Sequence, residues 1–354
     1  MAYTTIDKPS DYFNTKLYTG NGTDNNSTQS INMGLQPDLC WIKNRNLSGA
    51  SAQAHHIFDN VRGGNLRLMS DFSSAESDKS DRFNGITSTG FDLVQDDAGT
   101  NESPETYVAW GWKAGTSFTN DASATGIGSI DSTGSVSDAS GFSIVSYTGT
   151  GSAGTIKHGL SAAPNFMIVK NRDAARSWNV YFGDPTDYMY LNDTAAAADY
   201  NEIWNDTAPT TSVFSVGTDN GVNQSGEKYI AYIFAEKKGY SKFSSWIGNG
   251  SSNGPFCFTG FKPSFIIGKN TSRSEDWFML DNKRDTFNPV DERLQPNSSG
   301  AEATVTSLGI DFCANGFKLR GATNQYNPSG ETMIYMAFAE NPFTTSTGVP
   351  ACAR

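Results

Sequence analysis

The sequence contains no long apolar run and no basic segment. Nowhere does it reach the roughly 18 consecutive apolar residues that a membrane-spanning helix needs, so we expect no membrane insertion. Met1–Ser10 has neither the apolar core nor the basic leader of a secretory signal. Lysine and arginine number 26 against 37 acidic residues, a net charge of −11. Because an acidic surface repels phosphate groups, we expect no nucleic-acid partner.

Cysteine and histidine are few and scattered. The cysteines form no CxxC or Cys/His pair with metal-site spacing, which predicts free, partly buried thiols and no metal site. They are Cys40, Cys257, Cys313 and Cys352. The three histidines, His55, His56 and His158, are too dispersed to build a metal site or a Ser-His-Asp triad, and we expect them at the surface or at strand edges.

Sustained helical periodicity is also missing, and the best helical candidate, Asp193–Trp204, is short. What the chain has instead is 35 glycines and 12 % aromatic residues, a balance that suits short strands joined by tight turns. The fold class predicted is therefore all-β.

An aromatic strand ending in a glycine-rich turn occurs three times. The three segments are residues 13–22 (FNTKLYTGNG), 142–151 (FSIVSYTGTG) and 243–250 (FSSWIGNG). Alternating apolar positions indicate a half-buried strand, and the glycines supply the positive φ that a chain reversal needs.

A second recurring block has a glycine, a proline and an apolar strand that stops at Lys-Asn. The copies are residues 34–44 (GLQPDLCWIKN), 159–171 (GLSAAPNFMIVKN) and 260–270 (GFKPSFIIGKN). A continuous apolar run indicates burial on both faces. We therefore predict equivalent, central strands at Leu39–Lys43, Phe166–Lys170 and Phe265–Lys269.

Further blocks follow in the same order in each copy. Residues 57–62 (IFDNVR) match 279–284 (MLDNKR), whereas 180–184 (VYFGD) keeps the strand and loses the arginine. Short leucine- or tyrosine-containing strands come next, then strands at 90–93, 213–216 and 316–319. Closing strands at 107–110, 229–232 and 335–338 place a small alanine between bulky neighbours, and we predict that Ala109, Ala231 and Ala337 are buried.

These blocks predict three tandem homologous units, each an antiparallel β-sandwich-like fold. The units span residues 11–115, 141–239 and 240–345. They are preceded by an N-terminal arm at 1–10 and followed by a tail at 346–354. Residues 116–140, rich in Gly, Ser and Thr, form either a linker or an edge strand that ties neighbouring units together.

The strings YTGNG, GLxPxFxIVKN and DNKR and the closing YxAFAENPF resemble an uncharacterised repeat family of marine bacteriophage virion proteins, often described as tail or fibre components. The resemblance covers residues 12–343 and is looser in the first unit, where Trp110-Gly111-Trp112-Lys113 replaces the FAE ending. It implies a phage structural protein and does not distinguish a tail from a head or connector location. The absence of a signal agrees with assembly in the host cytoplasm.

Candidate sites are sparse. Trp204, in the loop 201–209, is the one tryptophan we expect to be an exposed contact, whereas Trp41, Trp246 and Trp277 fall on the apolar phase of strands and are expected in cores. A second cluster, Asp184, Asp187, Asn192 and Asp193, offers oxygen ligands for Ca²⁺ but fits no EF-hand loop, which favours a solvated polar loop. No catalytic residue, metal or cofactor is predicted.

The function expected is that of a virion structural protein, a tail or tail-fibre component that attaches to the host surface through exposed loops such as 194–209 and 282–300. Its partners would be other virion proteins and host-surface polysaccharide, within a homo-oligomer such as a trimer or ring. A head-decoration or connector role is one alternative. A polysaccharide-degrading glycosidase is another, although the pair of carboxylates about 5 Å apart that a retaining enzyme needs is not evident.

Overall fold

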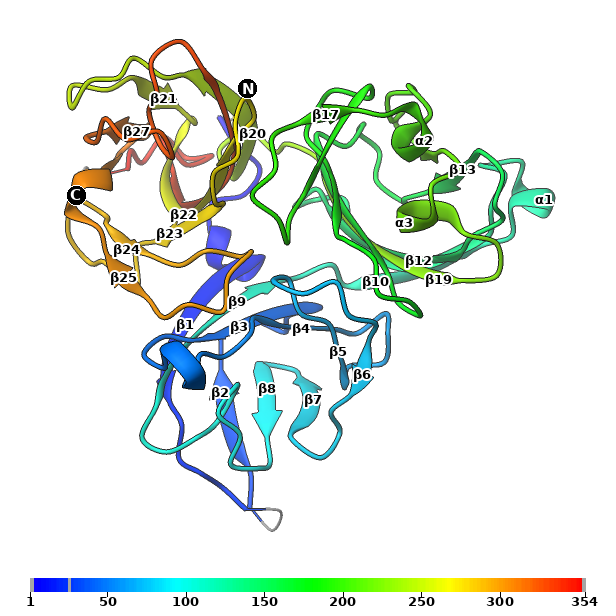
Figure 1. Cartoon of the computed structure of the whole chain (residues 1–354), viewed down its shortest axis with the longest axis horizontal. Coiled ribbons are helices and arrows are strands. Elements are labelled where there is room, and N and C mark those ends of the chain that lie inside the picture. Colours follow the sequence, from blue (N-terminus) through cyan, green and yellow to red (C-terminus); the bar gives the residue numbers. More distant parts are fainter. Residues whose placement is uncertain (1–2, 25–26, 352–354) are drawn as a thin grey trace.

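A computed structural model describes residues 3–24 and 27–351. Antiparallel sheets make up almost all of it and gather in three lobes (Figure 1). The first lobe contains strands β1–β9, the second β10–β19 and the third β20–β28. The predicted all-β class is therefore confirmed. In the described part of the chain, no helix has the length and apolar character that crossing a membrane requires.

The elements of the first lobe are 3₁₀-helix η1 (Pro9–Asp11), β1 (Phe13–Thr19), β2 (Gln29–Asn32), β3 (Leu39–Asn44), η2 (Gly49–Ser51), β4 (His56–Asp59), β5 (Leu66–Arg67), β6 (Ser77–Asp78), β7 (Phe83–Thr87), β8 (Gly90–Leu93) and β9 (Thr106–Trp112). Those of the second are β10 (Thr116–Asn120), α1 (Ala122–Thr125), β11 (Ser132–Ser137), β12 (Phe142–Thr148), β13 (Gly154–Lys157), β14 (Phe166–Asn171), β15 (Asn179–Tyr181), β16 (Asp187–Tyr190), β17 (Ala198–Asp199), α2 (Asn201–Trp204), β18 (Val213–Val216), α3 (Asn220–Asn223) and β19 (Lys228–Phe234). Those of the third are β20 (Ser241–Ile247), β21 (Phe256–Phe258), β22 (Phe261–Asn270), β23 (Phe278–Asp281), β24 (Glu292–Arg293), β25 (Ala303–Thr304), η3 (Thr306–Leu308), β26 (Ile310–Cys313), β27 (Gly316–Leu319) and β28 (Thr332–Pro342).

One strand order occurs in all three lobes. It reads β1-β9-β3-β4 in the first, β12-β19-β14-β15 in the second and β20-β28-β22-β23 in the third. The apolar strands that end in Lys-Asn, β3, β14 and β22, each lie between the closing strand and the next strand along the chain. Their interior position explains why their side chains are buried on both faces.

The closing strands alternate between two cores. In β19, Ile230, Tyr232 and Phe234 face a core that all three lobes share, whereas Tyr229, Ala231 and Ile233 face a core within the second lobe. Strands β9 and β28 alternate in the same way between the shared core and the cores of the first and third lobes. Each large sheet is thus covered on both faces.

Aromatic rings close the shared core across lobe boundaries. The ring centroids of Phe13 and Phe338 are 5.0 Å apart, and that of Phe234 lies 5.9 Å from Phe338 and 6.5 Å from Trp112. These four residues come from all three lobes. The lobes therefore bury one another's apolar surface and form one packed body.

Ala109, Ala231 and Ala337 have no exposed surface, which confirms the prediction of burial. Ala231 lies between Val145 on one neighbouring strand and Val169 on the other. We expect Ala231→Leu to overpack this core and to lower the free energy of unfolding by about 1–3 kcal/mol. Urea denaturation measures the loss, and an unchanged midpoint would mean that the site tolerates a larger side chain.

The glycine-rich turns after β1, β12 and β20 also follow the prediction. Gly22, Gly151 and Gly250 have φ values of +60°, +75° and +64°. This left-handed conformation is unfavourable for other residues, so the turn requires glycine.

One of the two alternatives for residues 116–140 is found, and the candidate helix is much shorter than expected. Residues 116–137 contain β10 and β11, which pair in sequence with β12 and extend the large sheet of the second lobe, so this segment is an edge extension rather than a free linker. The candidate helix 193–204 contains only the four-residue α2, after the short strand β17.

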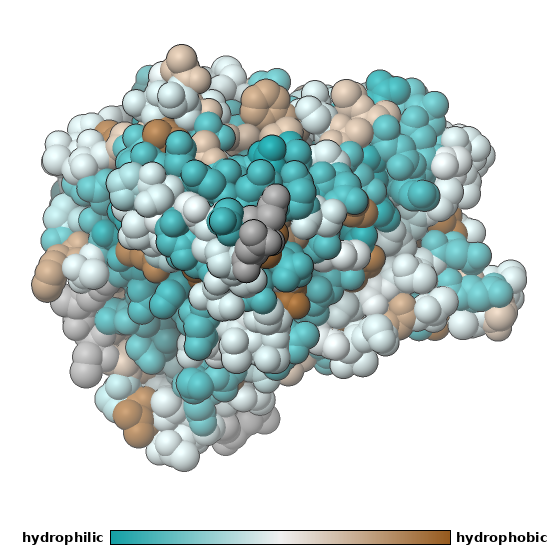
Figure 2. All heavy atoms as spheres, turned by 90° about the horizontal axis from the view of Figure 1, so that it is seen from below, coloured by the Kyte–Doolittle hydropathy of each residue, from teal (hydrophilic) through white to brown (hydrophobic). Residues whose placement is uncertain are grey.

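Cys40, Cys257 and Cys313 are free, as predicted, and the first two are buried; Cys352 lies outside the described residues. The surface seen in Figure 2 is mainly hydrophilic, with hydrophobic residues scattered over it. Because the surface is polar, we expect binding sites in grooves lined by hydroxyl and charged groups.

Candidate functional site

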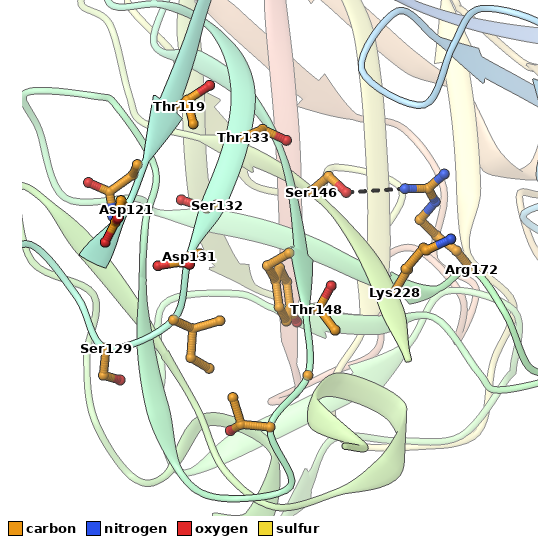
Figure 3. Close-up of a pocket in the computed structure, with 15 residues that line it drawn as sticks. Thr119, Asp121, Ser129, Asp131, Ser132, Thr133, Ser146, Thr148, Arg172 and Lys228 are labelled. Atoms are coloured by element: carbon orange, nitrogen blue, oxygen red, sulfur yellow. Dashed lines mark hydrogen bonds between the residues drawn. The ribbon is translucent and has the colours of Figure 1, made fainter. Parts of the chain in front are cut away.

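An open groove of about 740 Å³ lies on the sheet extension of the second lobe (Figure 3). Its wall is built by β10, β11 and β12 and by the turns that connect them. Most of its polar groups are hydroxyls, carried by Thr119, Ser129, Thr133, Ser146, Thr148 and Thr150. Ser132 and Tyr147 also line it, but their hydroxyls donate to the carbonyls of Lys157 and Val222. Asp121, Asp131, Arg172 and Lys228 add charge.

Strand register explains why the hydroxyls gather. Thr119 of β10 lies opposite Thr133 of β11, and Thr133 lies opposite Ser146 of β12. Directly paired residues point to the same face of a sheet, and neighbouring strands are about 4.8 Å apart. Three hydroxyls therefore form a row across three strands, and Figure 3 shows them around the groove.

Arg172 is held firmly at one side of the groove. Its Nε and Nη2 donate to Glu76 of the first lobe, each at 2.9 Å, and its Nη1 donates to the Ser146 hydroxyl at 3.1 Å. Such a two-point contact fixes the plane of the guanidinium group. Arg172 thus positions the hydroxyl row relative to the first lobe.

Lys228 supplies the positive charge that is available to a ligand. It lies opposite Thr148 at the start of β19 and is exposed. Within the described residues, its ammonium group has no ion-pair partner, whereas its backbone N–H donates to Asp173 at 2.7 Å.

The two aspartates of the groove are engaged by the short helix α1. Asp121 accepts from the Ala124 N–H at 3.0 Å and from the Ser123 hydroxyl at 2.7 Å, and these hydrogen bonds hold its pKa below the ordinary value. Asp131 accepts from the Ala122 N–H at 2.8 Å. Both carboxylates therefore cap the first turn of α1.

The arrangement suits a hydroxylated ligand. Hydroxyl side chains donate and accept hydrogen bonds, and the charged groups at either side orient a polar ligand without enclosing it. An open groove also admits an extended chain, since its ends are not closed.

Trp204, expected to be an exposed contact, is only 1 % exposed, so that expectation is wrong. Helix α2 turns the indole into the core of the second lobe, where its ring lies 5.8 Å from that of Tyr181. The other three tryptophans assigned to cores, Trp41, Trp246 and Trp277, are buried as predicted.

The histidines are buried, which contradicts a surface location. His55 Nδ1 accepts from the Trp41 indole N–H at 2.9 Å, and its Nε2 lies 3.0 Å from the carbonyl of Gln295 in the third lobe. His158 accepts at Nδ1 from the Leu160 N–H, and its Nε2 lies 3.2 Å from the Thr210 carbonyl. The hydrogen-bond partners of both rings are therefore groups of the protein's own fold.

The proposed calcium ligands are not brought together. Asn192 accepts from the Trp178 N–H, and Asp193 accepts from the Ala195 N–H, whereas Asp184 and Asp187 line a different cleft. In the described part of the chain, the acidic oxygens that do lie within 4.8 Å of one another belong to Asp285, Asp291 and Glu292. Asp285 accepts there from the N–H groups of Asp291 and Glu292 at 2.6 Å.

The two loops expected to face a receptor also contribute to contacts between lobes. Thr194 accepts through its carbonyl from Lys269 of the third lobe at 3.0 Å. The carbonyl of Ser299 accepts from Lys43 of the first lobe at 3.0 Å. Each loop thus contributes one backbone carbonyl to a contact between lobes, whereas Asp199, Asn201 and Asp206 remain exposed.

Sequence reasoning missed the groove because its residues lie in the segment interpreted as linker or edge strand. The available signal was the alternation of polar residues in 116–120 and 132–137, where exposed Thr119 and Thr133 are flanked by buried Asn120 and Ser132. Without the pairing of β10 with β11, the hydroxyls could not be placed in one row.

The family model described as a domain of unknown function (DUF7483) matches residues 8–342, nearly the whole chain. The search of curated proteins finds no match.

Proposed function

Since the chain belongs to the DUF7483 family of domains of unknown function, we propose its role from its own sequence and structure: it is a bacteriophage virion structural protein, a tail or tail-fibre component that attaches to the host surface and catalyses no reaction. The groove along β10, β11 and β12 is the surface through which it binds host polysaccharide. The row of hydroxyls formed by Thr119, Thr133 and Ser146 is the observation that carries this assignment.

We also propose that the chain contains three diverged copies of one β-sandwich-like unit, at 11–115, 141–239 and 240–345. The shared strand order of the large sheets supports it, as does the recurrence of Lys-Asn at the ends of β3, β14 and β22. In this arrangement, each copy packs a small sheet on one face and the shared core on the other. A rigid body of this kind presents a surface groove in a fixed orientation.

Assembly into a homo-oligomer, such as a trimer or ring with other virion proteins, is also part of the proposal. In the second lobe, β11 pairs with the outer edge of β12. The corresponding edges of β1 and β20 have no strand partner within the described residues. Unpaired edges of this kind are places where a neighbouring subunit can add a strand or a covering loop.

The absence of catalysis is supported by the state of the groove carboxylates. A glycosidase acid requires a raised pKa, so that it holds a proton near neutral pH. Hydrogen bonds from Ser123 and Ala124 instead lower the pKa of Asp121. A carboxylate in that state caps a helix and does not donate a proton.

The groove assignment predicts the effect of Lys228→Glu. We expect this variant to bind host cells at least tenfold more weakly, because it reverses the one cation in the groove that has no ion-pair partner within the described residues. Binding of fluorescently labelled protein to cells of the host strain is the measurement. Lys16→Glu, which makes the same charge change on the exposed face of β1, is the matched control and should bind normally. Equal binding by both variants would refute the groove as the attachment surface.

Antibody labelling of intact virions, viewed by electron microscopy, tests the location. Signal at the tail is expected. Signal confined to the head would favour the head-decoration or connector alternative, and unlabelled particles would refute the virion proposal.

Polysaccharide hydrolysis is the second candidate function, favoured by the carboxylates of Asp285, Asp291 and Glu292, whose oxygens approach within 4.8 Å. Retaining glycosidases use two carboxyl groups about 5 Å apart. If the purified protein releases reducing ends from host polysaccharide, and Glu292→Gln abolishes that release, hydrolysis replaces binding as the proposed function. Binding without release is the outcome expected.

A further inference from the structure

The three interfaces between lobes share one backbone hydrogen bond, but one interface differs from the other two in its side chains. In each, a backbone N–H of one lobe donates to the carbonyl of the residue that follows Lys-Asn in another lobe. Glu76 donates to Arg172, Glu302 to Arg45 and Ala197 to Thr271, at 2.9, 2.7 and 2.9 Å. These pairs therefore mark equivalent positions in the three interfaces.

Two of the interfaces carry a buried ionic network at these positions. Arg172 pairs with Glu76, and Glu76 also contacts Arg62, which pairs with Asp59 at 2.5 Å. In the second interface, Arg45 and Arg284 both pair with Glu302, and Arg284 pairs with Asp281 at 2.5 Å.

An aromatic donor of the neighbouring lobe completes each network. The Tyr232 hydroxyl donates to Asp59 at 2.7 Å, and the Trp110 indole donates to Asp281 at 3.2 Å. Both aromatic residues occupy equivalent places in the closing strands.

The interface between the second and third lobes has lost every member of this network. Thr271 and Ala197 replace the Arg–Glu pair, and Met336 replaces the aromatic donor. Phe182 and Pro185 stand in the positions of the buried Asp and Arg. Removing only one partner would leave a buried charge unpaired, which destabilises a fold by about 3–5 kcal/mol. Here the charged partners are absent together, so none of them is left unpaired.

A cleft of about 490 Å³ occupies the position where this network is missing. Ser245 and Thr332 line it from the third lobe, whereas Phe182, Asp184 and Asp187 line it from the second. No lysine or arginine is among its lining residues. The cleft thus combines hydroxyls, two carboxylates and a partly buried aromatic ring.

We propose that this cleft between the second and third lobes is a binding site for a neutral or amino sugar. The carboxylates accept hydrogen bonds from sugar hydroxyls or from an ammonium group, the serine and threonine hydroxyls supply further partners, and Phe182 offers an apolar surface to the ring. Anionic sugars are excluded, because Asp184 and Asp187 would face a third negative charge. The inference rests on the proposed attachment function and names a ligand class for a second site.

Isothermal titration calorimetry with glucose, galactose, N-acetylglucosamine, glucosamine and glucuronate tests the site. We expect binding of at least one neutral or amino sugar and no binding of glucuronate. The double variant Ala197→Glu/Thr271→Arg restores the ion pair found at the other interfaces and fills the cleft. It should keep or raise the melting temperature and weaken sugar binding at least tenfold.

Ser245→Trp, at an exposed rim position, blocks the cleft without altering the interface and should weaken binding to the same extent. Lys16→Glu, at an exposed position of β1 outside both sites, should bind these sugars normally. The attachment proposal is tested separately by the binding of Lys228→Glu to host cells, so its failure is distinguishable from failure of this one. Absence of binding by every neutral and amino sugar, equal binding of glucuronate, or unchanged binding in both cleft variants would overturn the inference.

Discussion

Phe338→Ala is expected to lower the free energy of unfolding by about 3–5 kcal/mol, the usual cost of truncating a fully buried phenylalanine. Phe338 is 1 % exposed and lies at the centre of the shared core. Its ring centroid is 5.0 Å from Phe13, 5.7 Å from Trp112 and 5.9 Å from Phe234. One truncation therefore removes contacts to the first and second lobes at once.

Because the lobes share this core, all three should unfold together. Guanidinium denaturation followed in parallel by tryptophan fluorescence and by far-ultraviolet circular dichroism should give coincident transitions, shifted equally by the substitution. Phe287→Ala is the matched control, since Phe287 is 81 % exposed and its truncation should change stability by less than about 0.5 kcal/mol. Separate transitions for the two probes, or similar midpoints for the two variants, would contradict a shared core.

The periodicity of the strands could be predicted from the sequence because it records local burial. The alternation of Tyr229, Ile230, Ala231 and Tyr232 indicates a strand covered on both faces, and the small alanine marks the tighter face. Alternation does not show which part of the protein covers each face of the strand. That one face of each closing strand meets the other lobes depends on contacts between residues more than a hundred positions apart.

Trp204 shows why the candidate site could not be predicted. A tryptophan in a polar loop rich in Asn and Asp has the composition of an exposed contact. Its burial depends on α2, a single helical turn that directs the indole onto Tyr181. Neither propensity nor spacing reveals that turn, since a four-residue helix has too few positions to show a period.

The histidines show that hydrogen bonds between distant parts of the chain cannot be predicted from local sequence either. His55 looks unpartnered in the sequence because its acceptor, the carbonyl of Gln295, lies 240 positions away in the third lobe. Long-range hydrogen bonds between lobes use groups that local sequence presents as available for binding.

These buried histidines make the fold sensitive to acid. In His55 and His158, Nδ1 accepts a hydrogen bond from an N–H donor, so a proton at Nδ1 would break that bond. Burial lowers the pKa of His158 to about 4 and places that of His55 well below its ordinary range, with Lys43 and Arg284 adding repulsion at His55. The folded chain therefore keeps both rings neutral where the unfolded chain protonates them.

A pKa that is depressed in the folded state gives stability that is present above the unfolded pKa of 6.5 and is lost as the pH falls toward the folded pKa. Each ring changes the free energy of unfolding by about 1.4 kcal/mol per pH unit in that window. Burial lowers the pKa of His56 as well, to about 3. Between about pH 6 and pH 4.5, the three rings together should remove roughly 4 kcal/mol per pH unit.

Urea denaturation at a series of pH values measures this slope. His158→Gln should reduce it by about 1.4 kcal/mol per pH unit, whatever its effect on stability at pH 7, because the variant lacks one of the three buried rings. Lys16→Gln, an exposed position of β1, is the control that removes a cation without removing a buried imidazole, and its slope should match that of the unmodified chain. If the slope stays the same in His158→Gln, the ring is already protonated in the folded state, and its hydrogen bond to the Leu160 N–H does not form in solution.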